Sequence, residues 1–137
     1  MLSQQQAKQV VSSYGAVSVS TVNPAGLVLM LFDGALRFIA RAEHGFDNKV
    51  LSRRNEEVHN NLTKARAILR ELQASLDMEA AGEFPSQMFA LYDFMIEQLL
   101  AADVRKEKAP IQNVVGLLSD IRNAWAEMTQ KFQSEGG

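Results

Sequence analysis

The chain has 137 residues, 47% hydrophobic and 22% charged, with no cysteine and a formal net charge of −2 at pH 7. This length fits one domain that buries about two thirds of the surface exposed by its unfolded chain. The absence of cysteine excludes disulfides and thiolate metal sites and is consistent with a reducing compartment. The slightly negative net charge gives no sign of the basic surface that binds nucleic acid.

The first 22 residues differ in kind from the rest, so we expect an N-terminal arm (1–22) and a single helical domain (23–137). Residues 1–32 carry one charge, Lys8, and the arm gives little helical signal, which predicts a short mobile or helical arm. The start of the chain lacks the basic and apolar regions of a secretory signal. The longest apolar run, residues 27–32, is too short to cross a membrane. We therefore expect a cytoplasmic protein without membrane insertion.

The first predicted helix opens at Asn23, a good N-cap, with Pro24 at the first helical position, and fades near Gly45 and Asn48. At 100° per residue its apolar side chains cover an arc of about 200°, whereas a core-facing stripe needs about 100°. The arc consists of Leu27, Val28, Leu29, Leu31, Phe32, Ala35, Leu36, Phe38, Ile39 and Ala42. On the narrow polar side, Asp33 and Arg37 are spaced to pair across one turn.

The second and fourth predicted helices, about 52–76 and 110–132, each carry a single apolar stripe. The second stripe is Val58, Leu62, Ala65, Leu69, Leu72 and Leu76. The fourth is Ile111, Val114, Leu118, Ile121, Trp125, Met128 and Phe132.

The third predicted helix, about 85–103, has two apolar lines. Its core stripe is Met88, Tyr92, Met95, Leu99 and Ala102. Beside that stripe, Phe89, Ile96 and Leu100 form a second line at helical spacing, with Asp93 among them.

Four helices joined by short connections predict an all-α fold, an antiparallel four-helix bundle. Because such a bundle gives each helix a similar share of core, two wide and two narrow helices indicate an apolar patch left for another helix. The alternative is that the wide arcs are core throughout, since a central helix touches two neighbours.

No residue pattern indicates an enzyme, a metal site or a cofactor. His44 and His59 are far apart and have no carboxylate cluster around them, and Asp33, Asp93 and Glu97 belong to no nucleophile motif.

Charge is uneven along the chain: residues 49–70 carry six basic and two acidic side chains, and residues 71–104 carry seven acidic and no basic ones. This favours a solvated pattern matched between neighbouring helices, with recognition of a partner as the alternative.

Four blocks together resemble the flagellar export chaperone family FliS. They read YGAVSVSTVNPAGLVLMLFDGALRFIARA, KARAILRELQASLDME, ALYDFMIEQLLAADVRK and VVGLLSDIRNAWAEM, and they span Tyr14 to about Met128. Two departures are mild: Asn123 and Ala124 precede the Trp where the family often has Asp and Ala, and VNP replaces a small residue, Ser or Thr, and Pro.

The resemblance implies a cytoplasmic, non-catalytic chaperone that holds the disordered C-terminal segment of flagellin, prevents early polymerisation and keeps flagellin competent for flagellar type III secretion. It also implies that the segment around Tyr14 can cover the groove for this client, and that flagellar export gate components are further partners. Combining this with the surplus apolar positions, we expect client contacts at ten residues. They are Tyr14, Val28, Leu29, Leu31, Phe32, Leu36, Ile39, Phe89, Ile96 and Leu100.

Two other readings stay open. The main alternative is a helical adaptor or self-oligomerising module that uses its second apolar face to bind itself, and an all-helical enzyme comes third. The free protein is expected to be a monomer or a homodimer.

Overall fold

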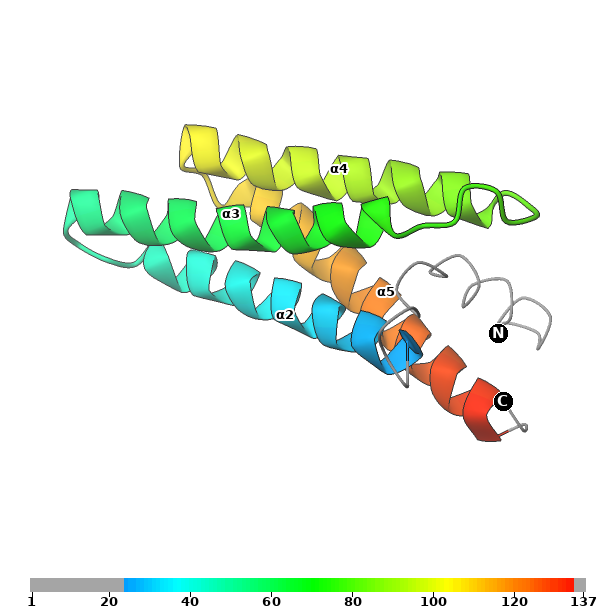
Figure 1. The fold of residues 1–137 in the computed structure, drawn as a ribbon. Coiled ribbons are helices and arrows are strands. Elements are labelled where there is room, and N and C mark those ends of the chain that lie inside the picture. Colours follow the sequence, from blue (N-terminus) through cyan, green and yellow to red (C-terminus); the bar gives the residue numbers. More distant parts are fainter. Residues whose placement is uncertain (1–23, 135–137) are drawn as a thin grey trace.

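The computed structural model describes residues 24–134, and it describes side chains as far as residue 131. Within this range it has four helices and no strand: α2 (Pro24–Gly45), α3 (Leu51–Ala74), α4 (Phe84–Arg105) and α5 (Ala109–Ser134). Successive helices run antiparallel, and α2 and α4 each pack against both α3 and α5 (Figure 1). The predicted all-α four-helix bundle is confirmed. The arm, residues 1–22, lies outside the described residues, so its boundary with the bundle stays a prediction.

Local chemistry explains where the helices begin and end. Pro24, Pro85 and Pro110 each stand in the first turn of a helix, where a missing N–H breaks no hydrogen bond. α4 is capped by Lys106, which adopts a left-handed conformation with φ 53° and ψ 52° and donates its N–H to the carbonyl of Ala102. This cap reverses the chain so that α5 can return alongside α4.

The predicted stripes of α3 and α4 form the core together with most of the α5 stripe. The five stripe residues within α3, the stripe residue Leu76 just beyond its end, and all five residues of the α4 core stripe are buried. On α5, Ile121 is half-buried, and the side chain of Phe132 lies outside the described part. The remaining α5 stripe residues are buried, namely Ile111, Val114, Leu118, Trp125 and Met128. Helical spacing therefore placed three of the four core faces correctly.

The helix α5 is inclined to the others, as Figure 1 shows in orange and red. Its C-terminal half runs past the first turn of α2 and away from the start of α4. The indole Nε1 of Trp125 donates a hydrogen bond to the carbonyl of Ala25 at 2.9 Å, which ties α5 to the start of α2. The C-terminal half of α5 therefore holds the first turn of α2 in place.

None of the described helices is long and apolar enough to span a bilayer.

Candidate binding surfaces

The wide apolar arc of α2 is mostly core, and this corrects the expected second face. Val28, Phe32 and Ile39 have no exposed surface, although Phe32 and Ile39 were expected on the side turned away from the core. Leu29, Leu31 and Leu36 are half-buried and pack against the same core. The alternative that a central helix uses a wide arc for two neighbours therefore accounts for most of α2.

The contacts on either flank of α2 show why the arc is wide. Toward α3, a Cβ added to Gly34 would lie 3.4 Å from Cδ1 of Ile68, so the two helices approach closely there. Toward α5, the Phe32 ring meets Trp125 edge to face, with ring centroids 6.4 Å apart. Because both flanks carry a packed neighbour, α2 needs apolar side chains across both.

The expected pair of Asp33 and Arg37 is wrong, because Asp33 binds Arg122 of α5 instead. Arg122 Nε donates to Asp33 Oδ1 at 2.7 Å and its Nη2 reaches Oδ2 at 3.4 Å, a two-pronged contact between facing helices. The hydrogen bond and charge of Asp33 raise the pKa of Arg122. Spacing along one helix could not reveal a partner that arrives from another helix.

On α4 the second apolar line is only partly exposed. Ile96 is buried, which corrects its expected place on a free face, whereas Phe89 is 38% and Leu100 45% exposed. Val104, four residues beyond Leu100 on the same helical face, is 75% exposed. We call the exposed residues Phe89, Leu100 and Val104 the α4 stripe; this set is distinct from the buried core stripe of the same helix.

Among the described residues, sequence reasoning missed six exposed large apolar side chains, namely Met30, Val50, Leu51, Met78, Phe94 and Val104. Val104 could have been found, since it continues the spacing of the second line by one turn. Met30 lies outside the predicted apolar arc of its helix, and Phe94 lies outside both predicted apolar lines of its helix. No periodic pattern in the sequence therefore indicates either residue. Tyr14, the remaining predicted contact, lies outside the described residues.

The α4 stripe borders the polar seam between α3 and α4. Gln73 of α3 is buried and its Nε2 donates to the backbone carbonyl of Phe89 at 3.0 Å and to Oδ1 of Asp93 at 2.7 Å. These bonds fix α4 against α3 near Phe89.

At the other end of that seam, the buried carboxylate of Asp103 gathers three basic side chains. His59 Nδ1 lies 2.8 Å and Arg66 Nη2 3.2 Å from Oδ2, and Lys106 Nζ binds Oδ1. Burial alone would raise the pKa of Asp103, but the hydrogen bonds and charges of Lys106 and His59 outweigh it and lower that pKa. The basic character of α3 and the acidic character of α4 are matched here, as one of the two sequence interpretations proposed.

No cluster of three or more His, Cys, Asp or Glu side chains that could hold a metal ion occurs in the part of the chain that the structure describes. The Asp103 group and the Asp33–Arg122 pair are contacts between helices. Among the described residues, the α4 stripe is the longest line of exposed apolar side chains.

Comparison with known proteins identifies the family of this chain. The profile of the family described as "Flagellar protein FliS" matches residues 6–132. The flagellar secretion chaperone FliS of Bacillus subtilis (strain 168) is 34% identical over 124 residues, covering 90% of this chain and 89% of the relative. The protein of the same name from Salmonella typhimurium is 36% identical over 126 residues, covering 88% and 90%. That from Escherichia coli (strain K12) is 32% identical over 112 residues, covering 80% and 79%. The chain belongs to the FliS family of flagellar proteins.

Proposed function

We propose that this chain is a cytoplasmic export chaperone that binds the disordered C-terminal segment of flagellin and keeps it from polymerising before export. The α4 stripe carries the proposal, because three large apolar side chains stand exposed at helical spacing on one face. Relatives of this chain that have a similar length are named flagellar secretion chaperones, and this supports the same role. Export gate components remain further proposed partners.

The mechanism is non-covalent and needs neither metal nor cofactor. Ordering a disordered segment on binding costs roughly 2–5 kcal/mol of the gross interaction energy, so the client must bury extended apolar surface in return. Phe89, Leu100 and Val104 offer such surface along α4, and the half-buried flank of α2 at Leu29 and Leu36 offers more. An amphipathic segment would lay its apolar face on these side chains.

Nine of the ten predicted client contacts lie within the described residues, and they divide by accessibility. Leu29, Leu31, Leu36, Phe89 and Leu100 are reachable from solvent in the described bundle, and we retain them as proposed contacts. The buried members are Val28, Phe32, Ile39 and Ile96. We propose that these act indirectly by holding the helices that carry the accessible residues, since direct contact would require the bundle to open.

The proposal is tested by pulling down full-length flagellin and flagellin lacking its C-terminal segment with this chain. Full-length flagellin should be retained and the truncated form lost. Equal retention of both, or of neither, would contradict the proposal.

Size-exclusion chromatography separates the chaperone from the self-binding adaptor that the sequence left open. A self-binding module would run as a dimer or larger and would not respond to a peptide of the flagellin C-terminal segment. We expect that peptide to form a stoichiometric complex with the chain.

A further inference from the structure

Two basic side chains flank one aromatic ring where α2 packs against α3, and a third lies one turn away on α2. Phe38 is half-buried against the core, and the Arg41 guanidinium carbon and Lys64 Nζ each lie 5.5 Å from its ring centroid. A Cβ added to Gly34 would lie 3.7 Å from Arg37 Nη2 and 3.4 Å from Ile68, so the Arg37 guanidinium also leans toward this seam. Arg37, Arg41 and Lys64 are all exposed, and we call them the basic seam.

The basic seam has no acidic partner within residues 24–131. The ion pairs in that range use other cations, such as Arg66 and Lys106 with Asp103, or Arg122 with Asp33. Asp33, the carboxylate that the sequence placed beside Arg37, is engaged by α5. Arg41 and Lys64 share the Phe38 ring, and Arg37 lies one turn before Arg41 on α2. These like charges repel one another, and an anionic partner would relieve that repulsion.

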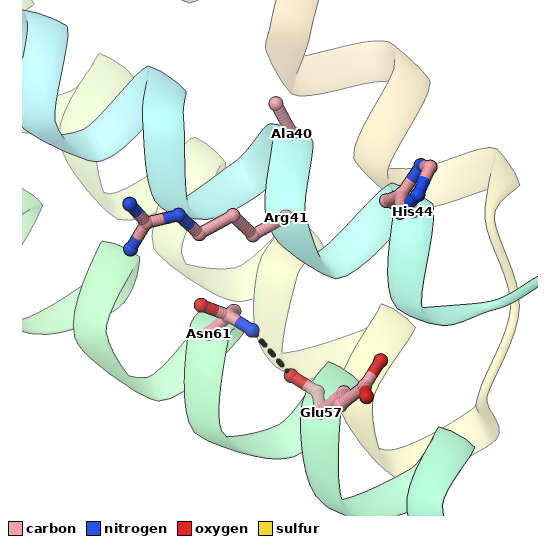
Figure 2. A pocket seen from close by; sticks show the side chains of 5 residues that line it. All are labelled: Ala40, Arg41, His44, Glu57 and Asn61. Carbon is pink, nitrogen blue, oxygen red and sulfur yellow. Dashed lines mark hydrogen bonds between the residues drawn. The ribbon is translucent and has the colours of Figure 1, made fainter. Parts of the chain in front are cut away.

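Next to the basic seam is an open depression of about 510 Å³, lined by Ala40, Arg41, His44, Glu57 and Asn61. Figure 2 shows Arg41 and His44 projecting from α2 on one side and Asn61 and Glu57 from α3 on the other. Asn61 Nδ2 donates to the backbone carbonyl of Glu57 at 2.8 Å, which leaves the amide oxygen of Asn61 available to a donor. Glu57 is the single carboxylate that lines the depression, so the depression is acidic near Glu57 and basic near Arg41.

We propose that the basic seam and this depression form a second protein-binding surface, which takes an acidic segment of a partner protein. Carboxylates of the segment would lie over Arg37, Arg41 and Lys64, and the aliphatic parts of its side chains over the Phe38 ring. Glu57 would set the direction by favouring a donor at its end. Met30, exposed and two turns before Arg37 on the same face of α2, extends the surface with an apolar contact.

Charge and shape favour an acidic protein segment over other anions. Nucleic-acid binding depends on the neutralisation of many phosphates at once, and three cations neutralise few of them. A membrane surface would lie flat across the helices and leave the depression between them unfilled. The N-terminal segment of the chain offers no complementary charge, because residues 1–23 contain no Asp or Glu.

The test is a titration of the full chain with decaglutamate, followed by amide chemical shifts in NMR spectra. Shifts should map to residues 34–44 and 57–68 and should weaken when salt is raised from about 50 mM to about 300 mM. The triple variant Arg37→Gln, Arg41→Gln, Lys64→Gln should bind the peptide at least about tenfold more weakly. The matched control is Lys49→Gln, Arg53→Gln, Arg105→Gln, which removes the same charge from exposed cations elsewhere and should change affinity less than about twofold.

Three results would overturn the proposal. Equal losses in the two triple variants would mean that only net charge matters. Binding to phosphatidylglycerol vesicles without binding to decaglutamate would identify a lipid surface. Loss of flagellin retention by the basic-seam variant, but not by the control, would make this face part of the client site. We expect flagellin retention to be unchanged, so this surface and the proposed chaperone function fail separately.

Discussion

Phe32 shows that the apolar side of α2 belongs to the bundle core. Its ring has no exposed surface, and it meets the Trp125 ring edge to face between α2 and α5. A side chain in this position holds two helices together, so changing it should act on stability before it acts on binding.

We predict that Phe32→Ala lowers the free energy of unfolding by about 3–5 kcal/mol, because it removes a fully buried ring and leaves a cavity. Urea unfolding followed by circular dichroism measures the loss. Leu51→Ala is the control: Leu51 is mostly exposed, and its truncation should change stability by no more than about 0.5 kcal/mol. A stable Phe32→Ala variant that had lost only flagellin binding would restore Phe32 to an exposed binding face.

Asp103 makes a prediction about pH. Because the folded state lowers its pKa below the usual value of 3.8, Asp103 contributes stability above that pH. The contribution is lost as pH falls through the lower folded pKa. Asp103→Asn should therefore destabilise the bundle near neutral pH and flatten the decline of stability in acid, measured as melting temperature against pH. A variant that melts like the wild type at pH 7 but keeps its full acid sensitivity would exclude this role.

At the scale of the helix, single stripes predict core more safely than wide arcs do. We expect Leu69→Ala and Leu118→Ala each to cost about 2–5 kcal/mol, because both side chains are fully buried at the centre of a single stripe. Chemical denaturation provides the measurement. Losses near zero at both positions would show that α3 and α5 do not pack through these stripes.

The core stripes of α3, α4 and α5 could be assigned from sequence because their residues recur at regular helical spacing. The arc of α2 could not be divided in this way, since α3 covers one flank and α5 the other, and spacing alone does not reveal which part of a wide arc is covered. The same limit explains Ile96, which shares a helical face with exposed Leu100 but is itself buried. Asp33 shows it for charges, because its partner Arg122 comes from a distant part of the sequence.

At the scale of the whole molecule, the arm and the client are expected to compete. If residues around Tyr14 shield the client groove, deleting residues 1–14 should raise binding of an apolar dye, promote self-association and speed flagellin binding. Hydrogen exchange across residues 28–39, with and without the deletion, measures shielding directly. Equal protection in the two free proteins would leave the arm without this role.

The account as a whole depends on whether flagellin binds through accessible apolar side chains. Calorimetric titration with a peptide of the flagellin C-terminal segment can compare Leu100→Asp, Val104→Asp in the α4 stripe with Val50→Asp, Leu51→Asp, which makes the same exchange at exposed positions before and at the start of α3. Melting temperatures confirm that both double variants are folded. We predict that the stripe variant binds at least about tenfold more weakly, while the control stays within about twofold of the wild type. Undiminished binding by a folded stripe variant, or equal loss in both variants, would contradict the account.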